Sequence, residues 1–85
     1  MAQLTLLYFA SVREAIGRSE ERVDVPDGIA TVGDLVDWLA RDEPHASAFR
    51  DRSRLRAAVD QQFAPMEAPI AAARELALFP PVTGG

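Results

Sequence analysis

The residues with the clearest chemical potential stand at the end of the sequence, which reads ALFPPVTGG and finishes on Gly84 and Gly85. Glycine has no Cβ, so this pair can enter a narrow channel and adopt backbone angles closed to other residues. Pro80 and Pro81 hold the approach to the glycines extended, near polyproline II. On the glycine pair alone we favour a frayed terminus, because terminal glycines are often poorly ordered. The stiff approach through the two prolines is what suggests a tail that enters a partner.

Few other residues of the chain could carry out chemistry. The absence of cysteine excludes disulfides, thiolate nucleophiles and cysteine-ligated metals. His45 is the only histidine, and it lies in EPHAS, which we interpret as a solvated connection. All nine basic residues are arginine, so no side-chain amine is available for acylation. We expect the chain to supply no catalytic side chain of its own and a partner to supply the pocket.

Composition restricts the class of partner. The 85 residues predict one domain, and the net charge of −4 disfavours nucleic acid as a partner. The stretch RDRSRLR, residues 50–56, is locally basic, but its arginines alternate with acidic and polar residues, so we interpret it as a solvated loop. No apolar run approaches membrane-spanning length, and no basic region precedes the apolar N-terminal run. We therefore expect a cytoplasmic protein with no membrane partner.

Four segments have the residue pattern of β-strands, in which side chains alternate between the two faces of a sheet. The first is apolar on both faces, so we expect it to lie inside the sheet and not at its edge. In the last, Leu76 and Leu78 face one way and Phe79 the other. The segments are residues 3–9, 20–25, 54–63 and 75–79.

Two segments have the pattern of helices. In the longer one, Thr31 and Asp34 have the spacing of a capping box. A shorter helix is predicted to begin at Ser11, paired with Glu14, and to end at Gly17. One amphipathic helix covers only one face of a sheet, so the sequence predicts a two-layer α+β domain. The apolar face of the longer helix consists of Val32, Leu35, Val36 and Leu39.

Three parts of the sequence together resemble one protein family. The opening YFASVREAIG, the helix TVGDLVDWLA and the ending LALFPPVTGG are similar to the small, sulfur carrier subunit of molybdopterin synthase, of the MoaD/ThiS-type ubiquitin-like family. The resemblance covers essentially the whole chain, and Pro-Pro-x-x-Gly-Gly is its most specific part. Two turns depart from the family pattern, because Ala73-Arg74 stands where Gly-Asp is common and Asp60 where asparagine is frequent.

The resemblance implies a ubiquitin-like β-grasp fold, with a mixed sheet of four to five strands packed on one main helix plus a short helix. Residues 1–79 would form this domain, and residues 80–85 an extended C-terminal tail. The α-carboxylate of Gly85 would be adenylated with ATP by a separate E1-like enzyme, and a sulfur donor enzyme would convert it to a thiocarboxylate.

The same resemblance implies a destination for the sulfur. It would pass from Gly85 to precursor Z inside the large subunit of molybdopterin synthase and form the dithiolene of the molybdenum cofactor. The implied assembly is a 2:2 heterotetramer of small and large subunits. No cofactor would be bound permanently, since the adenylating partner uses the ATP.

A second group of candidate site residues surrounds the base of the tail. Once the main helix covers one sheet face, alternation leaves Phe9 and Phe79 on the other, and Phe63 joins them if the strand bulges. We expect these three aromatic residues, together with the tail, to bind the large subunit. A second small core beneath a loop is the alternative. The tail residues of the predicted partner-binding set are Pro80, Pro81, Val82, Thr83 and Gly84.

Other functions remain open on sequence grounds. A ubiquitin-like modifier would use the same fold and activation but acylate lysines of other proteins. A sulfur carrier of another pathway, such as thiamine synthesis, is a further alternative with the same fold. A β-grasp binding module without covalent chemistry would leave the Pro-Pro-x-x-Gly-Gly ending unexplained. A stand-alone enzyme is disfavoured, because no acid/base or nucleophile constellation is visible.

Overall fold

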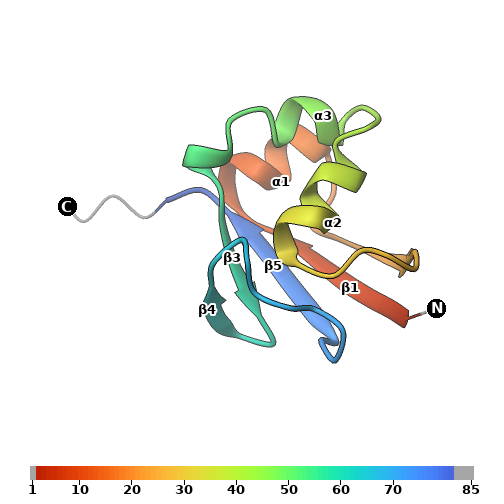
Figure 1. Cartoon of the computed structure of the whole chain (residues 1–85). Coiled ribbons are helices and arrows are strands. Elements are labelled where there is room, and N and C mark those ends of the chain that lie inside the picture. The colour runs from red at the N-terminus through yellow and green to blue at the C-terminus, as the bar shows by residue number, and fades with distance from the viewer. Residues whose placement is uncertain (1, 82–85) are drawn as a thin grey trace.

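Five strands form one mixed sheet, with the helices packed on one of its faces (Figure 1). The strands are β1 (Ala2–Tyr8), β2 (Glu20–Val25), β3 (Arg56–Val59), β4 (Gln62–Ala64) and β5 (Glu75–Phe79). The structure is a computed structural model and describes residues 2–81. Its strand order is β2-β1-β5-β3-β4, in which β1 and β5 are parallel and the other neighbours antiparallel. β1 therefore lies inside the sheet, as its apolar sequence predicted.

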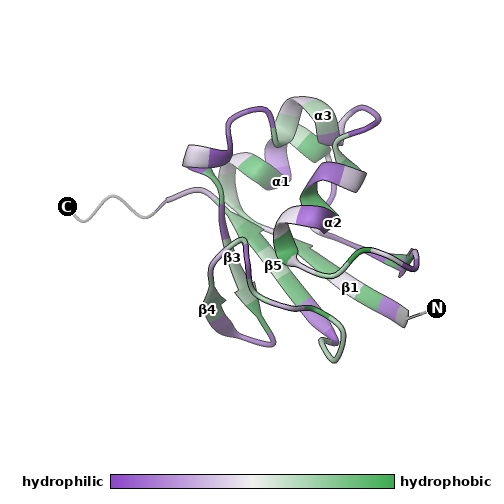
Figure 2. Cartoon of the chain, in the orientation of Figure 1, coloured by the Kyte–Doolittle hydropathy of each residue, from purple (hydrophilic) through white to green (hydrophobic). Residues whose placement is uncertain are grey.

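The helices cover the sheet face that carries the core (Figure 2). They are α1 (Ala10–Ile16), α2 (Val32–Leu39) and α3 (His45–Ala48). The predicted apolar face of α2 is buried, as are the inward residues of β1 and β5. None of the described helices has the length and apolarity to cross a bilayer. A mixed sheet with one main helix across it is the ubiquitin-like β-grasp fold, which confirms the predicted fold class. The fully buried residues of this core are Leu6, Val32, Leu35, Val36, Leu76 and Leu78.

The start of α2 confirms the predicted capping box. The backbone N–H of Asp34 donates to Thr31 Oγ1 at 3.1 Å, and Asp34 Oδ2 accepts from the N–H of Thr31 at 3.2 Å. These two bonds satisfy donors that would otherwise have no partner at the helix N-terminus.

The start of α1 differs from the prediction. Its N-cap is Phe9, with no side-chain cap, so the capping box predicted from Ser11 and Glu14 is wrong. The chain turns directly out of β1, and the Phe9 carbonyl accepts from the N–H groups of Val12 and Arg13 at 3.1 and 3.3 Å. Gly17 ends the helix in the left-handed conformation at φ 88°, as predicted.

Most of the third predicted strand, residues 54–63, belongs to a β-hairpin and does not form one continuous strand. β3 and β4 are joined by Asp60 and Gln61, whose φ angles are 47° and 73°. A two-residue hairpin turn with positive φ at both positions matches the twist of the strands it joins. The prediction missed it because the usual signal, a glycine in the turn, is absent.

The segment between α2 and β3 has more structure than predicted. His45 begins α3 and is not in a solvated connection, because its side chain is only 17% exposed. The basic stretch, residues 50–56, contains a 3₁₀ turn, η1 (Arg52–Arg54), followed by the buried Leu55 and the start of β3. Leu55 anchors this stretch, while Arg50 and Arg54 are exposed as a loop would predict.

Candidate functional site

The sheet face opposite the helices, here called the open face, carries most of the predicted partner-binding aromatics. The register places Ala58 opposite both Phe63 of β4 and Ala77 of β5, and Arg56 opposite Phe79. Cross-strand partners project to the same side of a sheet. Ala58 is absent from the core cluster, whereas its neighbour Ala57 belongs to it. The central residues of the open face are Leu7, Arg56, Ala58, Phe63, Ala77 and Phe79.

Phe63 and Phe79 meet on the open face. Their ring centroids lie 5.8 Å apart at an interplanar angle of 55°, and Phe63 remains 84% exposed. Phe63 reaches this face without a bulge, because the hairpin turn carries it back beside β3. Aromatic residues are enriched at the core of protein–protein interfaces, so a contacting pair of rings with one largely exposed suits a partner-binding surface.

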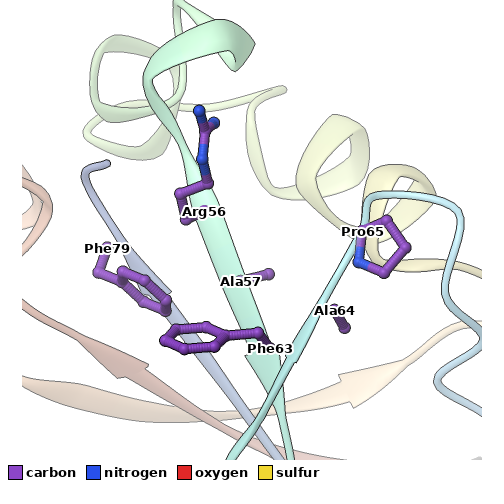
Figure 3. Close-up of a pocket in the computed structure, with 6 residues that line it drawn as sticks. All are labelled: Arg56, Ala57, Phe63, Ala64, Pro65 and Phe79. Atoms are coloured by element: carbon purple, nitrogen blue, oxygen red, sulfur yellow. The ribbon is translucent and has the colours of Figure 1, made fainter. Parts of the chain in front are cut away.

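The two rings form one side of an apolar groove of about 400 Å³ (Figure 3). Ala57, Ala64 and Pro65 complete its apolar lining. Arg56 also lines it, and its guanidinium points away from the rings toward η1, where Nη1 donates to the carbonyl oxygens of Ser53 and Leu55 at 3.1 and 3.0 Å. The groove can therefore receive an apolar side chain of a partner, and the guanidinium of Arg56 lies at the rim of the groove.

Phe9, the third predicted aromatic residue, does not line the groove. It follows β1, its N–H donates to the Leu78 carbonyl at 3.2 Å, and its side chain is 48% exposed. The structure thus places Phe9 beside the end of β5. It brings only Phe63 and Phe79 into ring contact among the three predicted aromatics.

The base of the tail emerges from the middle of the sheet. β5 ends at Phe79, and Pro80 and Pro81 follow it with partial exposure. The predicted site residues Val82, Thr83, Gly84 and Gly85 lie outside the described residues. The aromatic pair and the start of the tail are consequently adjacent in sequence and in space.

Asp60, which departs from the family pattern at this turn, is a positioning residue. Its Oδ1 accepts from the backbone N–H groups of Arg74 and Glu75, each at 3.0 Å. Its own N–H donates to the Glu75 carbonyl at 2.9 Å. Asp60 therefore ties the hairpin turn, which leads to Phe63, to the start of β5, the strand that ends at Phe79.

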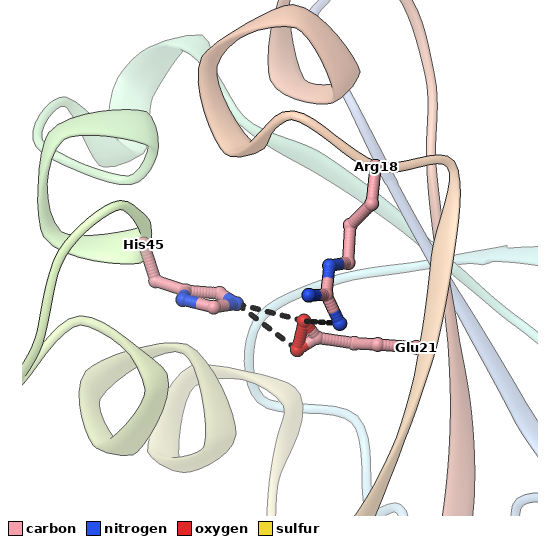
Figure 4. Close-up of polar contacts among 3 residues, drawn as sticks. All are labelled: Arg18, Glu21 and His45. Atoms are coloured by element: carbon pink, nitrogen blue, oxygen red, sulfur yellow. Dashed lines mark hydrogen bonds and ion pairs between the residues drawn. The ribbon is translucent and has the colours of Figure 1, made fainter.

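A partly buried polar cluster lies on the helix side of the sheet (Figure 4). His45 Nε2 is 3.1 Å from both carboxylate oxygens of Glu21, and Arg18 is 3.9 Å from Glu21 Oε2. The buried Tyr8 hydroxyl has no hydrogen-bond partner among the described residues, and burial, with a smaller effect of the Glu21 carboxylate, raises the pKa of Tyr8. This cluster attaches α3 to the sheet. No group of three or more potential metal ligands occurs within residues 2–81.

The sequence comparison with known proteins includes the residues at the end of the chain. The ThiS family model matches residues 6–85. The chain is 38% identical over 87 residues to the molybdopterin synthase sulfur carrier subunit of Mycobacterium tuberculosis, with 100% of each chain covered. It is 33% identical over 82 residues to the subunit of the same name from Haemophilus influenzae, covering 96% of this chain and 99% of the relative.

A solved structure supports the same relationship. The crystal structure of small archaeal modifier protein 1 from Haloferax volcanii superposes with a TM-score of 0.74 at 35% sequence identity. The match covers 96% of this chain and 100% of that protein. The shared fold therefore includes the sheet as well as the helices that cover it.

Proposed function

Because the chain belongs to the ThiS family, whose model spans residues 6–85, we propose that it is a sulfur carrier protein and the small subunit of a molybdopterin synthase. The observation that carries the proposal is the family match through the Pro-Pro-x-x-Gly-Gly ending as far as Gly85. The names of the two bacterial relatives favour the molybdopterin pathway over thiamine synthesis.

The reacting group in this proposal is the α-carboxylate of Gly85. A carboxylate is a poor electrophile, so a separate E1-like enzyme first joins it to AMP with release of pyrophosphate from ATP. A sulfide equivalent from a sulfur donor enzyme then displaces AMP and leaves a thiocarboxylate. Transfer of that sulfur to precursor Z, with an oxygen from water, restores the carboxylate. The dithiolene contains two sulfurs, so two carriers are consumed for each pterin.

The described geometry suits delivery of a tail. β5 is paired on both sides, so the base of the tail starts from a rigid position in the sheet. Pro80 and Pro81 have their own φ angles fixed by the proline ring, so the first two residues of the tail are already restricted before binding, which lowers the ordering cost. Each residue that must be ordered costs roughly 1–2 kcal/mol, so this restriction favours insertion of Gly84 and Gly85 into a partner.

The open face is the proposed contact for the large subunit of the synthase. Phe63, which is exposed, and Phe79, which is partly exposed, form an aromatic pair directly beside the base of the tail, so one partner can cover the pair and receive the tail together. Aromatic residues at the centre of an interface commonly contribute most of its binding free energy. Phe9 would extend this contact past the end of β1. A 2:2 assembly would form if two large subunits pair and each binds one carrier.

The chain itself supplies no catalytic side chain in this scheme. Adenylation uses ATP held by the activating enzyme, and no permanently bound cofactor is needed. The carrier contributes the reacting terminus, the stiff approach to it and the surface that orients both in a partner, in the cytoplasm.

A ubiquitin-like modifier is the second candidate. The likeness to small archaeal modifier protein 1 supports it, since both functions would use the same fold. The two differ in the nucleophile that attacks activated Gly85. Sulfur gives a free thiocarboxylate, whereas a lysine amine gives an isopeptide conjugate.

Intact-mass spectrometry tests the proposal. The full chain is incubated with ATP, the E1-like enzyme and a sulfur donor, and we expect the mass change of one oxygen replaced by sulfur. Addition of the large subunit and precursor Z should return the original mass. Persistence of the sulfur through that step, with conjugates on other proteins, would favour the modifier. Because the chain has no lysine, such conjugates cannot be chains linked through its own side chains.

A further inference from the structure

The arginines of this chain are concentrated near the tail. Residues 50–56 contain four arginines and one aspartate, a net charge of +3. The remainder, with five arginines and twelve acidic residues, carries −7. This segment is among the hydrophilic (purple) regions of Figure 2. The sulfur-carrier function as described above gives it no role.

Internal contacts hold this segment in place. Arg52 pairs with Asp37 of α2, and its Nη2 donates to the Gly33 carbonyl at 3.4 Å. Asp51 caps η1 by accepting from the Ser53 N–H at 3.0 Å. Arg52 thus attaches the segment to α2, and Arg56 bonds the carbonyl oxygens of Ser53 and Leu55 within it. Arg50 and Arg54 remain, and a fixed backbone presents them to solvent.

Arg50 and Arg54 line a groove of about 230 Å³ that runs between α1 and α3 and reaches Pro80. Both are exposed, and neither forms an ion pair among the described residues. Asp51 also lines the groove, and its hydrogen bonds from Ser53 lower the pKa of its carboxyl group, so it contributes one negative charge. The groove, here called the arginine groove, remains net positive.

The arginine groove and the open face border the same tail base but differ in chemistry. The open face is apolar around Phe63 and Phe79, and apolar contacts suit a long-lived complex. Exposed guanidinium groups accelerate encounter with an acidic surface and add less to lifetime. A carrier must leave its activating enzyme before it reaches the large subunit, so a charged contact suits activation.

We propose that the arginine groove docks an acidic segment of the enzyme that activates the tail, through Arg50 and Arg54. This inference rests on the proposed function, because it requires an activating enzyme. Guanidinium groups pair with carboxylates through two parallel hydrogen bonds, which favours aspartate and glutamate side chains as the occupants. The net charge of −4 on the whole chain disfavours nucleic acid in the same place.

A matched pair of double variants tests the inference. Arg50→Gln with Arg54→Gln removes two charges from the groove. Arg41→Gln with Arg74→Gln removes two charges from exposed positions that do not line it. Pyrophosphate release by the E1-like enzyme is measured against carrier concentration at about 0.05 M and about 0.5 M NaCl. Thermal unfolding establishes that all chains are folded.

The groove variant should lower kcat/KM about tenfold at low salt, mainly through KM, and about twofold at high salt, because salt screens exposed charges. The control should stay within about twofold of the native chain at either salt concentration. Equal losses in both variants, or unchanged kcat/KM of the groove variant at low salt, would overturn the inference. The proposed function would still stand if the native chain were adenylated. If the E1-like enzyme releases no pyrophosphate with the native chain, the proposed function itself is contradicted. Weakened large-subunit binding by the groove variant, measured by calorimetry, would assign the groove to the other partner and also overturn the inference.

Discussion

The two faces of the sheet are built from alternate residues of the same strands, yet their surroundings differ completely. On the helix side, Leu76 and Leu78 of β5 are 0% exposed. On the open face, Phe79 is partly exposed and contacts Phe63, which is 84% exposed. A shift of one residue along β5 separates the core from the proposed interface. Under the proposed function, fold and partner recognition are specified by different residues of one strand and can be separated by mutation.

Both edge strands of the sheet have features that discourage pairing with strands of other chains. β4, at one edge, has only three residues and is followed by Pro65. β2, at the other edge, exposes Glu20, Arg22 and Asp24. Short strands, proline and charge all discourage pairing with another chain. The exposed aromatics are left available for a partner that covers the face.

The largest expected effect is on the covered face. Leu78→Ala should lower the free energy of unfolding by about 2–5 kcal/mol, because it removes a fully buried side chain and leaves a cavity. That is a large part of the total for a domain of this size, on the order of 4–13 kcal/mol. Urea denaturation measures the loss. A loss under about 1 kcal/mol would contradict the placement of Leu78 in the core.

Substitutions on the open face should affect partner binding more than stability. Phe79→Ala should weaken binding to the large subunit by roughly 30-fold, because truncating a central interface aromatic typically costs at least about 2 kcal/mol. Phe63→Ala should act in the same direction with a smaller change in stability, since Phe63 is 84% exposed. Calorimetry measures both affinities. Unchanged affinity in two folded variants would remove the open face from the interface.

The turn that brings the two rings together offers an intermediate effect. Asp60→Ala removes the acceptor of two backbone N–H groups and places alanine at φ 47°. We expect the free energy of unfolding to fall by about 1–2 kcal/mol. Asp60→Asn is the control, because asparagine keeps an oxygen acceptor and tolerates positive φ. If both variants unfold at the same urea concentration as the native chain, the turn does not fix the hairpin.

The smallest expected effect is at Tyr8, whose buried hydroxyl has no partner among the described residues. Burial raises the pKa of Tyr8, so the folded state keeps a proton that the unfolded state loses above about pH 10. Stability should therefore fall as the pH rises past that value, and Tyr8→Phe should reduce this fall. At neutral pH the variant should differ by about 1 kcal/mol or less. Urea denaturation at neutral and alkaline pH measures both, and identical alkaline losses would contradict the assignment.

Much of the fold could be predicted because its patterns are long or specific. The bounds of β2 and β5 coincide with the predicted segments, since each is a clean alternation with defined ends. The capping box of Thr31 and Asp34 fixed the start of α2. Burial of alternate residues in β1 followed from its apolar composition.

The features that escaped prediction depend on contacts distant in sequence or on backbone groups. Asp60 and Gln61 reverse the chain without a glycine, so residues 54–63 were predicted as one strand. α3 has only four residues, too few to display a helical period. The contact of Phe63 with Phe79 exists only because the hairpin returns beside β3, so no local sequence pattern predicts it.

The central claim is that the terminal carboxylate of Gly85 carries the sulfur, and intact mass tests it most directly. Three chains are compared under identical activation: the native chain, one with an alanine appended after Gly85, and one lacking Gly85. All three should unfold alike, because the change lies beyond β5. Only the native chain should gain the oxygen-to-sulfur mass difference and lose it again to precursor Z in the presence of the large subunit. Sulfur transfer at the native rate by the extended chain would contradict the account.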